Sequence, residues 1–202
     1  ETNANNPMYY KNTENEWVLV GSDAWKLSWP TAQGSTAPST LTTGGVLTIN
    51  GYAFTIPATP DNTVNNLVTQ VNAANITGIV AANVGGRFTI YADSNATSDG
   101  STADGGIVTV ENQVGTPLTE LGLSERSYYT PALQQSPNYT VPQWNTFSAG
   151  GGAPTGSVWS KITNVNNGMN LVVEKYDSTL GVWVTQSCPV YTSRSEEHTS
   201  EL

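Results

Sequence analysis

The sequence has one cysteine, Cys188, and one histidine, His198, among its 202 residues. A lone cysteine can form neither an internal disulfide nor a zinc cluster. Charged residues make up only 11% of the chain, about half the usual share for a soluble domain. Acidic residues outnumber basic ones, which argues against nucleic acid as a partner. No run approaches the roughly 18 apolar residues of a membrane-spanning helix, so we expect no membrane segment.

The last nine residues, 194–202, read as the forward translation of a widely used sequencing adapter. Segments of such origin are set aside before the fold is considered. Without them the chain has no histidine, and six Lys+Arg stand against thirteen Asp+Glu, a formal charge of −7. The lack of histidine excludes Ser-His-Asp and Cys-His mechanisms and any histidine metal site. The start at Glu1 has neither an initiator Met nor an apolar signal segment, so we expect a fragment cut at both ends.

Gly, Ser, Thr and Asn take the place of the missing charges, and the chain carries six Trp and nine Tyr. Uncharged polar surface with β-forming and turn residues is typical of β-rich extracellular assemblies. Apolar residues remain frequent and the net charge is modest, so the composition does not indicate disorder. We predict an α+β fold that is mostly β, in which a small sheet with one packed helix is flanked by Trp-rich β-hairpin elements.

Residues 45–56 carry the clearest local signal, a β-hairpin around Asn50-Gly51. Both residues tolerate the positive φ of a type I′ turn. A two-residue loop pairs Ile49 with Tyr52 and Leu47 with Phe54. These four side chains are then expected on one face of the hairpin.

A helix of about three turns is predicted within residues 61–74. Its apolar stripe lies at i, i+3, i+4 and i+7 and consists of Val64, Leu67, Val68 and Val71. Asp61 or Asn62 is expected to cap its start, and Asn75 to end it. We expect this helix to lie on the sheet.

The rest of this region reads as strands and turns. Strands are predicted at residues 79–82 and 87–91, joined through Gly85-Gly86, and at residues 107–111. Residues 93–106 are rich in Asp, Ser, Gly and Thr, which predicts a long loop between them. Residues 117–123 are expected to form a terminal turn.

The segments 45–51, 63–73, 88–90 and 121–123 together resemble the "IN" motif of flagellar hook-associated and cap proteins, which has counterparts in myovirus virion proteins. Val71-Asn72 stands where the motif usually has Ile-Asn at the end of the helix. The resemblance covers about 80 of 193 residues. It implies a small α+β module of an assembled appendage, and it brings no catalytic residue with it.

A second signal is an internal repeat of the form Tyr-x-Asn/Ser-Thr-x-x-x-Trp-Val. One copy runs from Tyr10 to Trp17 and Val18, and the other from Tyr176 to Trp183 and Val184. Each copy reads as two strands around a polar turn, and the two aromatics can pair across the strands, which contributes up to about 1 kcal/mol. Coincidence in an aromatic-rich chain is the alternative.

The repeat and the module predict a beaded organisation. Residues 154–159 followed by the second repeat copy are similar to large structural proteins of T4-like phages. The expected units are 1–34, the end of a preceding Trp-rich β repeat; 40–124, the IN-like module; 125–155, a linker rich in Pro and Gly; 156–193, a Trp-rich β-hairpin repeat; and 194–202, the adapter-derived segment.

Acidic residues offer little chemistry. Asp93, Asp99 and Asp104 are spaced six and five apart, whereas a calcium loop needs closely spaced oxygen ligands, so we interpret them as solvated. The pairs Glu111 with Glu120 and Glu174 with Asp177 fit exposed strand or turn positions better than a glycosidase pair. We therefore predict no enzyme, no metal and no cofactor.

Aromatic residues raise a binding alternative. Trp25, Trp29, Trp144 and Trp159 are the tentative interface residues, because tryptophans can form platforms for sugar rings. They can equally act as wedges between modules, since aromatics dominate protein interfaces. Trp25 and Trp29 directly precede the IN-like module, which favours a wedge at that joint.

The interpretation is therefore a structural component of a phage tail, baseplate or fibre, assembled in the host cytoplasm and extracellular as part of the virion. The expected partners are other virion proteins and copies of the chain itself. A flagellar cap or bacterial surface adhesin is the alternative of the same class. A tail-fibre module that binds host surface glycan is the alternative of another class.

Deletion of residues 194–202 should leave the midpoint of thermal unfolding unchanged, because we assign this segment no part in the fold. The measurement is a melting curve of the full chain and of the shortened chain under the same buffer. A clear loss of stability in the shortened chain would show that the segment belongs to the folded protein.

Overall fold

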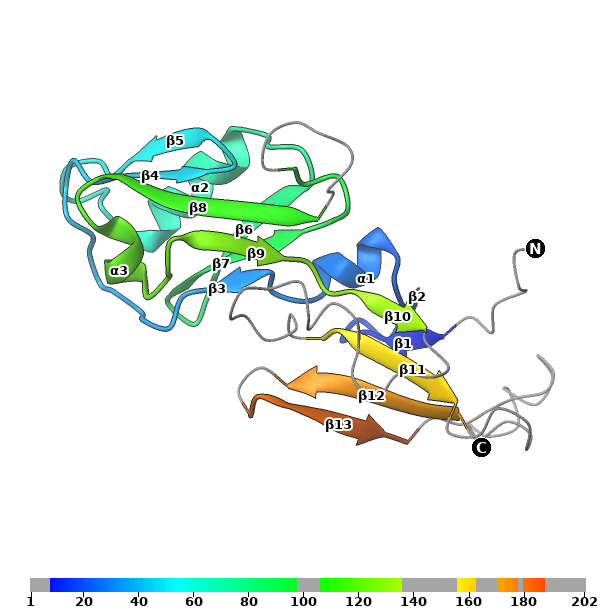
Figure 1. Cartoon of the computed structure of the whole chain (residues 1–202). Coiled ribbons are helices and arrows are strands. Elements are labelled where there is room, and N and C mark those ends of the chain that lie inside the picture. The colour runs from blue at the N-terminus through cyan, green and yellow to red at the C-terminus, as the bar shows by residue number, and fades with distance from the viewer. Residues whose placement is uncertain (1–7, 98–105, 136–155, 163–170, 178–179, 188–202) are drawn as a thin grey trace.

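A computed structural model describes residues 8–97, 106–135, 156–162, 171–177 and 180–187. These residues form an α+β fold that is mostly β, as predicted, with three short helices and several small sheets (Figure 1). The sheets have the strand orders β5-β4-β8-β9, β3-β7-β6 and β10-β11-β12-β13, and β1 and β2 form a separate ribbon. The strands are β1 (Tyr9–Lys11), β2 (Trp17–Leu19), β3 (Ala32–Gln33), β4 (Val46–Ile49), β5 (Tyr52–Thr55), β6 (Ile79–Val84), β7 (Arg87–Ala92), β8 (Ile107–Val114), β9 (Arg126–Tyr129), β10 (Leu133–Gln135), β11 (Val158–Ile162), β12 (Leu171–Asp177) and β13 (Val182–Gln186).

The predicted hairpin is confirmed as β4 (Val46–Ile49) and β5 (Tyr52–Thr55). Ile49 pairs with Tyr52 and Leu47 pairs with Phe54, as expected. Asn50 and Gly51 have φ values of 46° and 80°, which a type I′ turn requires. Tyr52 is the exception to the expected burial, because it is half exposed while Leu47, Ile49 and Phe54 are buried.

Asn50 also joins the hairpin to β8 (Ile107–Val114), which extends three residues beyond the predicted strand. The Asn50 side chain donates to the Ile107 carbonyl at 2.9 Å and accepts from the Thr109 N–H at 2.7 Å. Its backbone N–H donates to the Thr109 carbonyl at 2.9 Å. The turn therefore continues the β4–β8 ladder past the end of β4.

The predicted helix is α2 (Val64–Ala73), with Val64, Leu67 and Val71 buried. The expected cap was wrong, because Thr63 is the N-cap and its hydroxyl accepts from the Asn66 N–H. Asn62 is instead buried and donates its amide to the Leu41 carbonyl at 2.7 Å. Asn75 follows the C-cap residue in the left-handed conformation and ends the helix as predicted.

The two strands joined through Gly85-Gly86 are confirmed as β6 (Ile79–Val84) and β7 (Arg87–Ala92). Helix α2 packs on β6, and Asn72 pins the strand to the helix. The Asn72 amide accepts from the Ala81 N–H at 2.8 Å and donates to the Ala81 carbonyl at 2.9 Å. Of the pair Val71-Asn72 that stands for the Ile-Asn of the motif, Val71 is thus buried and Asn72 is hydrogen-bonded to β6.

The first core lies between α2 and the sheets β5-β4-β8-β9 and β3-β7-β6. Its fully covered side chains include Leu47, Ile49, Leu67, Val71, Phe88, Ile90, Val108, Val110 and Leu121. Residues 117–123 were predicted as a turn but contain a short helix, α3 (Pro117–Leu121). Pro117 suits the first turn of a helix and Gly122 ends it with a φ of 71°.

The predicted boundaries were wrong at two places. Within the expected linker, residues Arg126–Tyr129 form β9, which pairs with β8, and Leu133–Gln135 form β10, which pairs in parallel with β11 (Val158–Ile162). The prolines of this region indicated an irregular segment, but β9 and β10 are strands because each pairs with the edge of a neighbouring sheet. β3 (Ala32–Gln33) also pairs with β7, so the module begins before residue 40. Residues 136–155, with the rest of the predicted linker, and residues 98–105 of the predicted loop lie outside the described residues.

Replacing Leu67 with Ala should lower the free energy of unfolding by about 2 to 5 kcal/mol, as for other fully buried leucines. The reason is that Leu67 is completely covered where α2 packs on the sheet. The exposed Thr69 on the same helix provides a control, since Thr69→Ala should change stability by less than about 0.5 kcal/mol. Urea denaturation of both variants measures the difference, and equal costs would contradict the helix packing.

Candidate functional site

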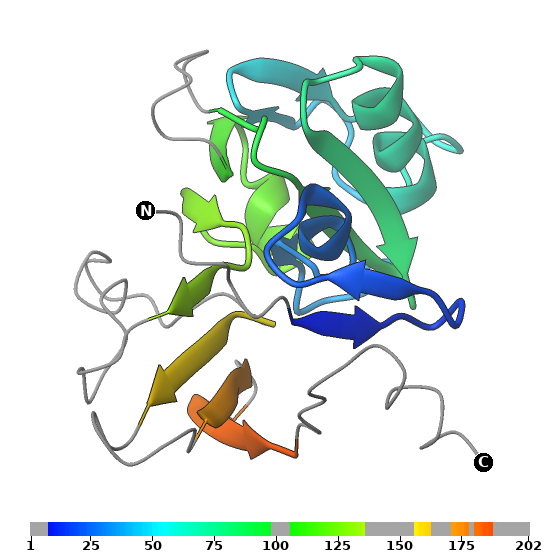
Figure 2. The ribbon, with the colours of Figure 1, turned by 90° about the vertical axis from the view of Figure 1, so that its right-hand side faces the viewer.

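A second, smaller core joins elements from the two ends of the chain. Its buried residues are Val20, Trp25, Val158 and Val173, and Met8, Tyr10, Val18, Trp29 and Leu133 pack against them. The contributing elements are the ribbon of β1 (Tyr9–Lys11) and β2 (Trp17–Leu19), helix α1 (Asp23–Leu27), β10, β11 and β12 (Leu171–Asp177). Figure 2 shows the ribbon and α1 between the module and the last sheet. We call this second core the aromatic joint.

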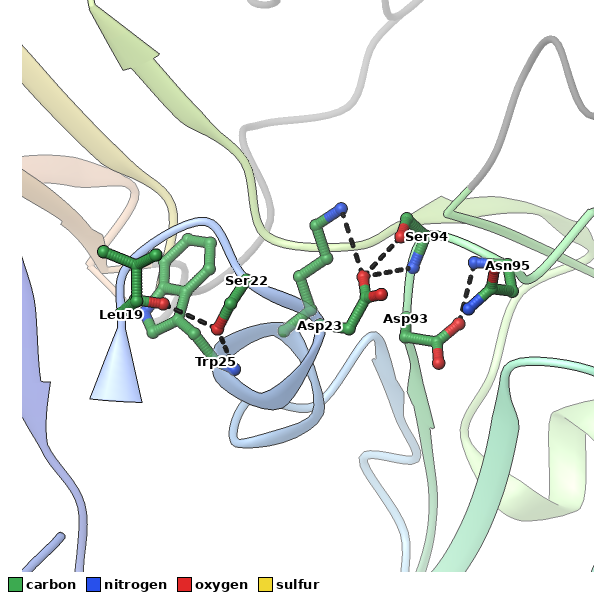
Figure 3. Close-up of polar contacts among 8 residues, drawn as sticks. Leu19, Ser22, Asp23, Trp25, Asp93, Ser94 and Asn95 are labelled. Atoms are coloured by element: carbon green, nitrogen blue, oxygen red, sulfur yellow. Dashed lines mark hydrogen bonds and ion pairs between the residues drawn. The ribbon is translucent and has the colours of Figure 1, made fainter. Parts of the chain in front are cut away.

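Three residues separate β2 from helix α1, and Ser22, the last of them, forms hydrogen bonds with both elements. The Ser22 hydroxyl accepts from the Trp25 N–H at 3.2 Å and donates to the Leu19 carbonyl at 2.7 Å (Figure 3). Such a cap contributes about 1 kcal/mol to a helix. The cap orients the single turn so that Trp25 faces inward, where only 1% of it is exposed.

Asp23 ties α1 to the chain after β7. Its carboxylate accepts from the Ser94 N–H at 3.1 Å and from the Ser94 hydroxyl, and Lys26 Nζ lies 3.9 Å away (Figure 3). The hydrogen bonds from the Ser94 hydroxyl and N–H, aided by the Lys26 charge, lower the pKa of Asp23. The joint is therefore anchored to the first core through α1.

Trp29 lies at the centre of the joint. The Tyr10 ring centroid is 5.6 Å from that of Trp29, and Lys175 Nζ lies 3.8 Å from the Trp29 ring. On another side Gly156 approaches so closely that a Cβ there would lie 2.6 Å from Trp29 Cγ. One indole ring thus contacts β1, β12 and Gly156, two residues before the start of β11.

Lys175 is partly buried against this ring. Burial lowers the pKa of the Lys175 ammonium, against the opposing effect of the nearby Asp177 carboxylate. A cation over an indole face gains about 0.5 to 2 kcal/mol, with the larger values for desolvated pairs. The aromatic joint is thus held by both apolar burial and a cation–π contact.

The opposite face of the last sheet carries a second aromatic group. Trp159 and Trp183 lie with ring centroids 6.0 Å apart, and Tyr176 and Trp183 with centroids 5.3 Å apart, both edge to face. Tyr176 on β12 pairs directly with Trp183 on β13 (Val182–Gln186), as predicted for this repeat copy. Trp159 is only 2% exposed.

The first repeat copy differs in register. Tyr10 pairs with Val18, and Trp17 pairs with Lys11, whose ammonium lies 5.5 Å from the indole centroid. The expected pairing of Tyr10 with Trp17 was therefore wrong. A shift of one residue sends the two aromatics to opposite faces, because side chains alternate along a strand. Tyr10 turns inward to Trp29, and Trp17 is half exposed.

The predicted interface tryptophans differ in burial. Trp25 and Trp159 are buried, so the idea that they form exposed sugar platforms was wrong. Trp29 is partly buried in the joint, and Trp144 lies outside the described residues. The exposed aromatics of the ribbon are instead Tyr9 and Trp17. Alternation along β1 and β2 was the signal that could have separated them from Tyr10 and Val18.

The predicted acidic residues do not converge in the part of the chain that the structure describes, where no three His, Cys, Asp or Glu side chains form a metal-binding group. Asp93 accepts from the Asn95 N–H at 2.7 Å, and Glu120 accepts from the Thr42 N–H at 2.8 Å. Asp99 and Asp104 lie outside the described residues. Within the part of the chain that the structure describes, no helix is long and apolar enough to cross a membrane.

Comparison with known proteins adds no identification. No protein-family model matches the chain, and no curated protein matches its sequence.

Replacing Gly156 with Ala should destabilise the protein by at least about 1 kcal/mol more than replacing Gly181 with Ala, because an overpacked contact is costly. Both glycines have positive φ, 86° and 68°, so both variants share the backbone penalty. Only Gly156 faces the Trp29 ring, whereas Gly181 faces open space. Urea denaturation measures both costs. Equal losses would mean that the ring contact is not tight.

Proposed function

We propose that this chain is a non-enzymatic structural component of a phage tail, baseplate or fibre, where it acts as a modular spacer and assembly protein. The observation that carries the proposal is the aromatic joint. Trp29 contacts Tyr10, Gly156 and Lys175, which lie far apart in the sequence, so the two ends of the described chain are held together. A spacer needs such a rigid connection between its parts.

The use of the tryptophans supports this role over ligand binding. A sugar platform needs an accessible ring face, but Trp25 and Trp159 are almost fully buried. Burial of large aromatic side chains contributes strongly to the stability of cores and interfaces. The chain therefore places these side chains in contacts between its own elements, as a wedge between modules would.

The polar contacts support an architectural role as well. The side-chain amides of Asn50 and Asn72 each donate one hydrogen bond to strand backbone and accept one from it. The carboxylates of Asp23 and Glu120 accept hydrogen bonds from backbone N–H groups of distant segments. These groups hold elements in place. Residues 1–193 have no histidine to act as a general base near neutral pH.

The glycan-binding alternative has one observation in its favour. Tyr9, Trp17 and Leu19 share the outer face of the β1–β2 ribbon and are each at least two-fifths exposed. An aromatic pair on a flat ribbon can stack on sugar rings, with Lys11 beside it on the same face. This alternative is now assigned to Tyr9 and Trp17 rather than to the buried tryptophans.

Long-read sequencing of the source DNA across this fragment tests the phage assignment. We expect the reading frame to continue past residue 193 without the adapter peptide, through further Tyr and Trp-Val repeats, beside tail or baseplate genes. A frame that runs into coiled-coil termini among flagellar genes would instead favour the flagellar alternative and contradict the phage proposal.

Binding of the full chain to a glycan array separates the structural role from the glycan alternative. The structural proposal predicts no retained glycan. Retention that Trp17→Ala abolishes, and that a control substitution at the exposed Tyr52 leaves intact, would establish the binding role instead.

A further inference from the structure

The Asn50-Gly51 dipeptide carries a chemical reactivity that the preceding roles do not use. An asparagine followed by glycine can deamidate without an enzyme. The glycine nitrogen attacks the asparagine side chain, and glycine has no Cβ to obstruct the attack. Two such dipeptides occur in the chain, Asn50-Gly51 and Asn167-Gly168, and the second lies outside the described residues. The contacts of Asn50 determine when the first can react.

The reaction has two steps. The Gly51 nitrogen first bonds to Asn50 Cγ, and the Cγ–Nδ2 bond breaks. The side-chain nitrogen leaves as ammonia with the proton from the Gly51 N–H, and a five-membered succinimide ring remains. Water then opens this ring at Cγ, which gives aspartate, or at the backbone carbonyl carbon, which gives isoaspartate. The net change replaces an amide by a carboxylate, and water is the only co-reactant.

Hydrogen bonds to β8 hold the Asn50 side chain away from Gly51 in the folded chain. β4 lies between β5 and β8 (Figure 1), and the turn at its end reaches the first residues of β8. Asn50 Nδ2 donates to the Ile107 carbonyl at 2.9 Å, and Asn50 Oδ1 accepts from the Thr109 N–H at 2.7 Å. Ring closure has to break both hydrogen bonds, because it brings Cγ to the Gly51 nitrogen.

The turn conformation opposes ring closure as well. Asn50 has a φ of 46°, and the first central residue of a type I′ turn has a ψ of about +30°. At this ψ the Gly51 nitrogen lies nearly opposite Cβ across the Cα–C bond of Asn50, whereas the five-membered ring requires both on the same side. Gly51 itself is exposed and Asn50 is only 8% exposed. The protection therefore comes from the conformation and contacts of Asn50, and not from burial of the glycine.

We infer that Asn50-Gly51 is a latent deamidation site, which the folded chain keeps unreacted and which reacts when the hairpin opens. The product refolds to a weaker structure. Aspartate at this position places a carboxylate oxygen where Nδ2 meets the Ile107 carbonyl, so two acceptors face each other and the carbonyl loses its donor. Isoaspartate passes the main chain through the former side chain, which lengthens the two-residue loop and is incompatible with a type I′ turn.

This reactivity goes beyond the proposed function and does not depend on it. It follows from the hairpin contacts alone, so it holds for a phage, flagellar or glycan-binding protein alike. A chain whose hairpin has once opened for long enough carries a permanent chemical mark at the turn. The mark adds one negative charge at neutral pH to a chain that is already acidic.

Reaction rates in the folded and the unfolded chain test the protection. The full chain is incubated in mildly alkaline buffer with and without denaturing guanidinium chloride, and peptide mapping by mass spectrometry follows both dipeptides. In denaturant, Asn50 and Asn167 should react at similar rates, because both precede glycine. Without denaturant, Asn50 should react at least about tenfold more slowly, since each hydrogen bond contributes a factor of roughly 2 to 10 and the turn must also open. Equal rates at Asn50 under both conditions would overturn the inference.

Asn50→Asp tests the consequence, because it is one of the two products. It should lower the folded-to-unfolded equilibrium constant at neutral pH by at least about fivefold, as expected when a part-buried acceptor loses its donor. Asn15→Asp is the matched control, because Asn15 also lies in a hairpin turn at positive φ, 70°, but is exposed. Its equilibrium constant should change by less than about threefold. Equal changes in the two variants, measured by urea denaturation, would show that the contact with β8 is not what deamidation removes.

Refolding of reacted chains tests both products together. The full chain is kept in denaturant until part of the sample has reacted at Asn50, and is then returned to buffer. A brief protease digestion removes the chains that remain unfolded. Aspartate and isoaspartate at position 50 should be depleted among the surviving chains compared with the sample before digestion. The same proportion in both samples would mean that the modified hairpin refolds normally, which contradicts the inference.

Discussion

The contacts of the Trp29 indole are what the arrangement of the described chain depends on. The ring is packed between Tyr10 of β1, Gly156 before β11 and Lys175 of β12, which come from opposite ends of the sequence. Without this ring the last sheet would keep its own strand pairing but lose a main contact with the ribbon and α1. The apolar area of an indole and its attraction for a cation act here at one position.

Two asparagine amides play a similar role inside the module. Asn50 extends the β4–β8 ladder beyond the turn, and Asn72 completes the outer side of β6 from the neighbouring helix. An amide carries a donor and an acceptor in the same spacing as a peptide group, so it can stand in for a strand partner. At β6 this protects one edge of the sheet β3-β7-β6.

Local chemistry explains which parts of the fold were predictable. Asn50-Gly51 determined the hairpin and its register, because positive φ at both positions is available to few other pairs. The apolar spacing of Val64, Leu67 and Val71 determined the helix and its buried face. The helix cap was predicted at the wrong residue, because Asn62 is held by Leu41, a partner 21 positions away that local spacing does not reveal.

The sequence by itself determined the fold class, the main hairpin, helix α2 and the small number of groups available for chemistry. Only the tertiary structure decided which tryptophans are buried, that Tyr10 and Trp17 lie on opposite faces, and that the two ends share the aromatic joint. The physical reason is one of range. Turn conformation and helical periodicity depend on neighbours along the chain, whereas burial depends on which distant surfaces meet, and a shift of one residue in a ribbon exchanges its two faces.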